Sequence, residues 1–231
     1  MPDLSPTIDS ELEHIYSNFS GIDPEVVAVE TSAGVSPNDS STIMGISWIN
    51  TLNVAVQYES AYMEFDTSGI TSTPESATLK IYPQDVQDGG TDFYVCRAYL
   101  ASAGTIVAGD LDAYVKTGPS SGTSFSNIVK YSSKVESLTE DEMNSITLNS
   151  TALADMVSRD EFQIALVTYH IIDDDLGGIT DGSEDGFNIR SQDHSTSAHR
   201  PVLSYELPSV PIPNLKVYGS IEMNGGKIII K

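Results

Sequence analysis

The sequence predicts an all-β protein: a jelly-roll-like antiparallel β-sandwich with a short N-terminal helix and a C-terminal β-hairpin tail. Two observations support this fold class. Short runs rich in Val, Ile and aromatic residues recur along most of the chain, and clusters of Ser, Pro, Asn and Gly separate them. The chain has 231 residues, which fits one large sandwich, or one domain of about 180 residues with an arm at each end.

The N-terminal arm, residues 1–24, contains a stretch with helical spacing. Asp9 or Ser10 is available to cap a first turn, and Asp23-Pro24 ends the pattern. Two interpretations stay open, because such a helix either closes one end of the core or docks on a neighbouring subunit. The apolar residues that define the stripe are Ile8, Leu12, Ile15, Tyr16 and Phe19, of which Leu12, Ile15 and Phe19 are the candidate partner-binding residues.

From residue 25 to residue 207 the hydrophobic period changes to two, which is typical of a sandwich. Alternation places Met63, Phe65 and Leu79 on a core face, and Glu64 and Lys80 on a solvent face. Residues 150–159 break the alternation, and a Ser cap before good helix formers predicts a short helix there. The expected strands are 25–31, 43–48, 52–58, 61–66, 77–82, 92–100, 111–116, 127–131, 144–149, 162–169 and 200–207.

The chain ends in a Pro-rich linker, residues 208–214, and a hairpin tail, residues 215–231. An Asn-Gly-Gly turn at 224–226 lies between two apolar runs, which is a strong hairpin signal. A two-stranded hairpin alone is marginal in water, so we expect the tail to need a partner surface. That surface is either its own sandwich or another subunit or protein that extends the sheet. The candidate partner-binding residues of the tail are Leu215, Val217, Ile221, Ile228, Ile229 and Ile230.

The charge and the apolar pattern exclude two classes of partner. The formal net charge is −22, and 11 scattered cations do not form the basic face that nucleic acid requires. No apolar stretch approaches the roughly 20 residues of a membrane span, and no signal-peptide pattern opens the sequence. We therefore expect no membrane partner and assembly in a cytoplasm. The lone Cys96 lies in an apolar run and is expected to be a small core residue.

Several segments resemble the DNRLRE-type domains, which are β-sandwiches similar to carbohydrate-binding modules. Residues 62–70 (YMEFDTSGI) and 76–82 (SATLKIY) resemble the family's YLRFDLSSIP and SATLRLY hairpin. Residues 146–157 resemble its DVTALVQ segment, and residues 187–191 and 200–206 resemble its closing pair. The resemblance spans about residues 25 to 207 in the right order. It implies polysaccharide or cell-wall attachment, although Trp48 is the only Trp and the family's Trp-rich middle motif is missing.

Few residues in the sequence suggest chemistry. His194 and His199 lie in a Ser/Thr loop without metal-ligand spacing, and no nucleophile or phosphate-binding motif is present, so we expect no enzyme activity. The densest acidic segment, residues 173–185, partly matches a calcium loop, which makes Ca²⁺ the one candidate cofactor. The alternative is a hydrated acidic loop. The candidate calcium ligands are Asp173, Asp175, Asp181 and Glu184.

These features predict a non-enzymatic structural protein of a virus particle. The expected types are a capsid decoration protein, a head fibre or a tail-fibre subunit of a bacterial virus, an expectation reached by analogy. Like subunits, with a trimer favoured, and other virion proteins are the expected partners. The alternative is a carbohydrate-binding module that adheres to host glycans through exposed tyrosines. A hydrolase has no motif in its favour.

Overall fold

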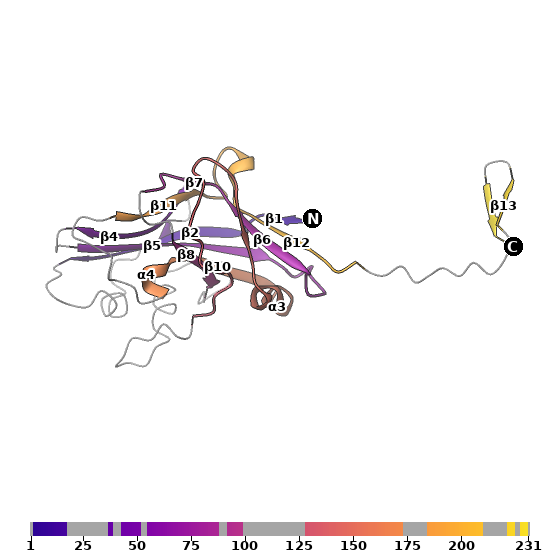
Figure 1. The fold of residues 1–231 in the computed structure, drawn as a ribbon, viewed down its shortest axis with the longest axis horizontal. Coiled ribbons are helices and arrows are strands. Elements are labelled where there is room, and N and C mark those ends of the chain that lie inside the picture. Colours follow the sequence, from indigo (N-terminus) through magenta and orange to yellow (C-terminus); the bar gives the residue numbers. More distant parts are fainter. Residues whose placement is uncertain are drawn as a thin grey trace.

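Antiparallel strands form almost all of the regular structure, in two sheets that pack face to face and a separate two-stranded hairpin (Figure 1). The structure, a computed structural model, describes residues 2–17, 37–38, 43–51, 55–87, 92–98, 128–172, 184–209, 221–224 and 227–230. The predicted all-β sandwich is confirmed. The jelly-roll connectivity of the strands stays a prediction.

The smaller sheet has four strands, and every neighbouring pair is antiparallel. The alternation predicted for residues 77–82 is confirmed, because half-buried and fully buried residues alternate along the observed strand. In spatial order the strands are β1 (Asp3–Leu4), β12 (Val202–Glu206), β6 (Ser76–Ile81) and β9 (Asn144–Thr147). One edge of this sheet is therefore β9.

The larger sheet is organised around one long strand, β5 (Ala55–Asp66). On one side β5 pairs with β2 (Ile8–Ser17), and on the other its first half pairs with β4 (Ile43–Thr51) and its second half with β10 (Glu161–Thr168). The sequence predicts two strands here, split at Glu59 and Ser60, but both residues pair within the ladder. The remaining strands are β3 (Pro37–Asn38), β7 (Pro83–Gln84), β8 (Phe93–Arg97) and β11 (Glu184–Arg190).

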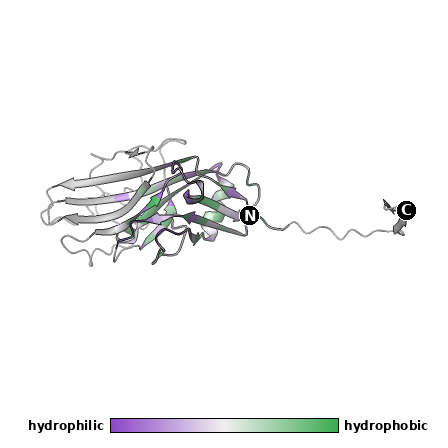
Figure 2. Ribbon diagram, turned by 90° about the horizontal axis from the view of Figure 1, so that it is seen from above, coloured by the Kyte–Doolittle hydropathy of each residue, from purple (hydrophilic) through white to green (hydrophobic). Residues whose placement is uncertain are grey.

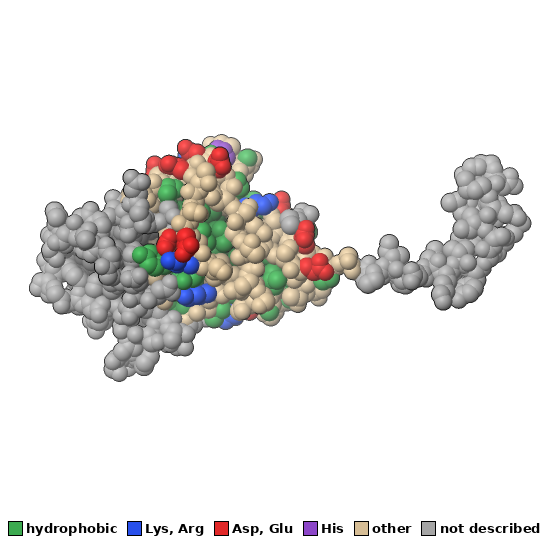
Figure 3. Space-filling model, in the orientation of Figure 1, with side chains coloured by type: hydrophobic (Ala, Val, Ile, Leu, Met, Phe, Trp, Pro, Cys, Tyr) green, Lys and Arg blue, Asp and Glu red, His purple; other side chains and the backbone are tan. Residues whose placement is uncertain are grey.

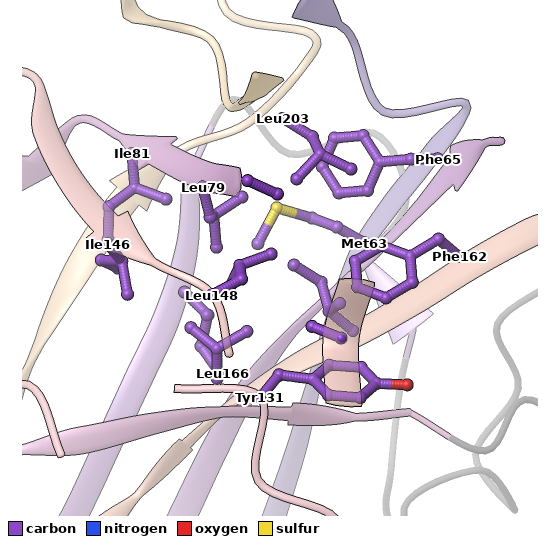
Figure 4. Close-up of a cluster of buried hydrophobic side chains, with 14 of the residues drawn as sticks. Met63, Phe65, Leu79, Ile81, Tyr131, Ile146, Leu148, Phe162, Leu166 and Leu203 are labelled. Carbon is purple, nitrogen blue, oxygen red and sulfur yellow. The ribbon is translucent and has the colours of Figure 1, made fainter. Parts of the chain in front are cut away.

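The hydrophobic core lies between the two sheets. Large side chains from both layers meet there, including Met63 and Phe65 from β5, Leu79 from β6 and Leu203 from β12 (Figure 4). These four side chains are fully buried. Figure 2 shows green, hydrophobic residues interspersed with purple, hydrophilic ones along the described strands. Cys96 is also buried, as predicted. Burial of these apolar side chains supplies most of the stability of the fold.

The short helices connect strands around this core. The predicted helix at 150–159 is confirmed as α3 (Ser150–Ser158), and it buries Ala152 and Met156 in the core. Its cap is Asn149 rather than a serine, because the Asn149 side chain accepts hydrogen bonds from the backbone N–H groups of Thr151 and Ala152. A single turn, α4 (Tyr169–Ile172), follows β10, and a 3-10 turn, η2 (Ser197–His199), precedes β12.

The predicted N-terminal helix is wrong. Residues 8–17 form β2, which pairs with β5 over ten residue pairs from Ile8↔Glu64 to Ser17↔Ala55. Ile8, Leu12 and Tyr16 are spaced by four residues, which fits one face of a helix and also one face of a strand. The spacing alone therefore does not distinguish the two. Pairing with the long strand β5 makes this segment a strand. Residues 2–17 therefore belong to the sandwich and do not form a separate arm.

Two further expectations change at the residue level. Glu64 is buried at 4% exposure and not solvated, because β2 and β10 flank β5 on either side. Its carboxylate accepts hydrogen bonds from Gln163 Nε2 at 2.8 Å and Thr7 Oγ1 at 3.4 Å. Residues 128–131 form a single bridge, Lys130↔Cys96, and no strand. The strands expected at 25–31 and 111–116 lie outside the described residues.

Candidate functional site

The predicted hairpin tail is confirmed as two strands, β13 (Ile221–Asn224) and β14 (Lys227–Ile230). They form a two-stranded sheet of their own, and neither pairs with a described strand of the sandwich. The register is Ile221↔Ile230, Glu222↔Ile229, Met223↔Ile228 and Asn224↔Lys227.

This register sorts the tail residues into two faces, because directly opposite residues of an antiparallel pair share a face and successive pairs alternate. One face carries only apolar residues, which are Ile221, Met223, Ile228 and Ile230. The other face carries Glu222, Asn224, Lys227 and Ile229. The three consecutive isoleucines are therefore divided between the faces, and Ile229 lies on the mixed one.

Leu12 and Ile15, two of the other predicted partner-binding residues, do not share one face as the predicted helix would place them. Leu12 and Ile15 lie in β2, opposite Ser60 and Gln57 of β5. Three residues apart along a strand, they lie on opposite faces, so the predicted helical stripe does not exist. Phe19, Leu215 and Val217 lie outside the described residues.

The calcium hypothesis falls largely outside the described part of the chain. Asp173, Asp175 and Asp181 are not described, and Glu184 is the first residue of β11, opposite Ile49 of β4. Among the described residues, no group of three or more His, Cys, Asp or Glu side chains is placed to hold a metal ion. The calcium loop stays a prediction.

An open groove of about 380 Å³ lies beside the edge strand β9. Residues 145–149 line one side, and residues 132–137, which bridge to β8 through Val135↔Phe93, line the other. The two sides meet at Asn149, whose backbone N–H donates to the Tyr131 carbonyl at 2.7 Å. Sequence analysis missed this groove, because it arises from the end of one sheet facing a segment tied to the other sheet.

The surroundings of the groove are acidic. Lys134 is the one cation in its lining, and its ammonium contacts Asp92 at 2.8 Å and Glu136 at 3.5 Å. The hydrogen bond to Asp92 raises the pKa of Lys134, so this cation stays charged and committed to its carboxylates. The turn that leads into β9 adds three exposed acids, Glu140, Asp141 and Glu142. Figure 3 shows red carboxylates at several places on the described surface and few blue cations.

One buried polar cluster holds residues 128–135, the groove segment, against the sandwich. The Tyr131 hydroxyl donates to Asp155 Oδ2, and Arg97 Nε donates to the same oxygen at 2.9 Å. Burial alone would raise the pKa of Asp155, but the hydrogen bonds from Tyr131 and Arg97 lower it below its usual value. Burial raises the pKa of Tyr131. These groups satisfy one another, so the cluster ties β8, α3 and the 128–135 segment together and offers no free acid or base.

The loop histidines are stacked rather than simply solvated. The His199 ring lies on Tyr82 with ring centroids 3.9 Å apart, and His194 stacks on His199 at 5.5 Å. Both histidines and Tyr82 are half-buried. This stack joins the 191–200 loop to the residue that follows β6.

The described tyrosines do not provide an exposed platform for a sugar ring. Six of the 11 tyrosines have described side chains, and none of these six is exposed: Tyr62, Tyr82, Tyr94, Tyr131, Tyr169 and Tyr205. Four of them are buried, and Tyr82 and Tyr169 are half-buried, so we interpret the six as core or core-edge residues. The other five lie where side chains are not described, so the glycan alternative stays a prediction.

Among the described residues, no helix is long and apolar enough to cross a membrane. No protein-family model matches the chain, and no curated protein sequence matches it.

Proposed function

We propose that this protein is a non-enzymatic structural subunit of a virus particle. The C-terminal hairpin attaches the chain to neighbouring subunits, and the acidic sandwich is the part that is displayed. The single observation that carries the proposal is the hairpin itself, which has one wholly apolar face and pairs with no described strand of its own sandwich.

The energetics of a small hairpin support attachment. A two-stranded sheet is marginal in water, and four apolar residues on one face lose the benefit of burial unless a partner covers them. Burying one such side chain stabilises by about 1.5–3 kcal/mol. An exposed apolar strand pair is also an aggregation hazard, so a chain that carries one needs a defined partner.

The charge of the sandwich supports display. Residues 1–207 carry eight cations and 32 acids, a formal charge of −24. Bodies of like charge repel, which keeps them soluble and disfavours contact between their broad surfaces. Attachment through the small hairpin would join the subunits while their acidic sandwiches point outward and stay apart. The choice of a capsid decoration protein, head fibre or tail-fibre subunit rests on this architecture and on analogy.

The decisive experiment compares the oligomeric mass of the full chain with that of a chain lacking residues 208–231, by sedimentation. We expect a defined homo-oligomer, with a trimer favoured, that becomes a monomer on deletion while the melting temperature of the sandwich is kept. A full-length monomer whose mass is unchanged by the deletion would contradict the proposal.

A matched pair of substitutions tests the apolar face in the full chain. Ile228→Asp places a charge on the apolar face, and Ile229→Asp places the same charge one residue away on the mixed face. We expect Ile228→Asp to dissociate the oligomer more strongly than Ile229→Asp. Equal effects would show that the faces are not distinguished.

A further inference from the structure

We propose that the hairpin tail of one copy of this chain binds in the groove beside β9 of a second copy and extends the smaller sheet. This inference rests on the proposed function, because it names the partner of the tail. Three observations carry it: the free edge of β9, the charge of the groove and the charge of the tail.

The first observation is that β9 offers unused backbone groups to the groove. Leu148 N–H donates to the Ala77 carbonyl at 3.0 Å, in register with Thr147↔Thr78. Hydrogen-bonded and non-hydrogen-bonded pairs alternate along an antiparallel ladder, so Ser145 and Thr147 direct their N–H and C=O groups away from β6. No described residue forms a hydrogen bond with these outward groups. An added strand would satisfy them.

The second observation is that the groove has a mixed lining that suits an amphipathic strand. Its apolar lining residues, Val135, Ile146 and Leu148, belong to the core or pack against it. Ser145 and Thr147 are exposed and lie on the opposite face of β9. A hairpin that turns its apolar face toward the core would place Ile229 and its neighbours on the side of Ser145 and Thr147.

The third observation is charge complementarity. Residues 208–231 carry three Lys residues and a single acid, Glu222, although the rest of the chain has a formal charge of −24. The tail thus has a formal charge of +2 at the end of an acidic chain. In the groove lining Lys134 is the only cation, and it is already paired with Asp92 and with Glu136 of the lining, while the turn of exposed acids at residues 140–142 connects the two lining segments along the chain. Opposite charges steer such a docking and fix its orientation.

The occupant is a second copy, since within one chain the tail pairs with no described strand of its own sandwich. A tail that enters the groove of the next copy makes a heterologous contact. Such contacts close into a ring when the rotation between copies allows it, and a closed ring agrees with the trimer favoured above.

Cysteine cross-linking tests the pairing in the full chain. The native Cys96 is buried and does not compete. Thr147→Cys is mixed with a chain that carries Ile229→Cys, and a short bifunctional thiol reagent is added. We expect a cross-linked dimer that contains both chains. The control replaces Thr147→Cys with Ser72→Cys, an exposed position in the loop between β5 and β6, and should give none.

A second variant removes the edge donor without touching the ladder to β6. Thr147→Pro deletes the outward N–H, and proline is tolerated on an edge strand where its N–H would face away from the sheet. We expect self-association to weaken about tenfold. Ser145→Lys, which adds a cation to the edge and repels the tail, should act in the same direction. Unchanged self-association in both variants would overturn the inference.

The outcomes separate this inference from the proposed function. A tail-dependent oligomer without the cross-link would overturn the groove as the docking site and leave the proposed function intact. A double variant, Thr147→Cys with Ile229→Cys, that cross-links only within one chain would assign the groove to its own tail and overturn the second copy. Absence of any tail-dependent oligomer would overturn both.

Discussion

At the scale of single residues, Asp9 shows how burial changes a titration. Asp9 lies near the start of β2 at 2% exposure, and its Oδ2 accepts a hydrogen bond from the Gln192 N–H at 2.6 Å. Burial raises its pKa to about 6, partly opposed by the Gln192 hydrogen bond and aided by the nearby charge of Asp193. The folded protein therefore binds a proton here more tightly than the unfolded chain.

We expect Asp9→Asn to stabilise the protein near neutral pH. Because the folded-state pKa is raised from 3.8 to about 6, the stabilisation by the protonated form is complete below pH 3.8 and is lost as the pH rises through 6. Asn keeps an oxygen acceptor for Gln192 and has no charge. The gain in the free energy of unfolding should be up to about 3 kcal/mol at pH 7 and should vanish near pH 4. Urea unfolding at a series of pH values measures it.

Asp193→Asn is the control, since it removes one negative charge at a nearby exposed position. We expect it to change stability little at any pH. A gain for Asp9→Asn that does not vary with pH would show that the substitution acts through packing and not through the titration of Asp9.

At the scale of elements, alternation in the sequence predicted strands well where one face of the strand is buried. β6 follows the expected pattern, with Leu79 buried between half-buried neighbours. In the second half of β5, Met63 and Phe65 are buried as expected, but Glu64 on the other face is buried as well. Alternation failed as a predictor where pairing with a neighbouring strand determines the secondary structure. β2 reads equally well as a helix, and Glu59-Ser60 reads as a break, yet both become regular by pairing along β5. The groove beside β9 could not be predicted, because it depends on how the two sheets end.

Helix α3 provides a prediction at this scale. Asn149 caps the helix and also donates from Nδ2 to the Lys130 carbonyl at 2.8 Å, so one side chain joins the helix to the groove segment. Asn149→Ala should lower the free energy of unfolding by about 1–2 kcal/mol in urea titrations. Ser150→Ala, at the exposed first helical residue, should stay within about 0.5 kcal/mol. Equal losses would contradict the assignment of the cap.

At the scale of the whole molecule, charge is distributed unevenly along the chain. The first 207 residues carry a formal charge of −24 and the last 24 carry +2. This asymmetry can be calculated from the sequence, but its meaning depends on the structure, in which the acidic turn leads into β9, a strand whose outer edge pairs with no described strand. Self-repulsion within so acidic a body opposes the compact state.

We therefore expect added salt to stabilise the sandwich. Raising NaCl from about 0.1 M to about 1 M shortens the screening distance from roughly 10 Å to roughly 3 Å, which weakens repulsion between surface carboxylates more than the buried Arg97–Asp155 pair. The urea midpoint of unfolding should rise. A midpoint that falls with salt would show that surface ion pairs, such as Lys134–Asp92, outweigh the repulsion.

The position of β12 has a mechanical consequence. This strand is the last one before the linker, and it is hydrogen-bonded on both sides, to β1 and to β6. Tension transmitted from an anchored tail would run along its axis, while its hydrogen bonds lie across that axis. They would then be sheared together instead of peeled open one after another, a geometry suited to a subunit held by its end.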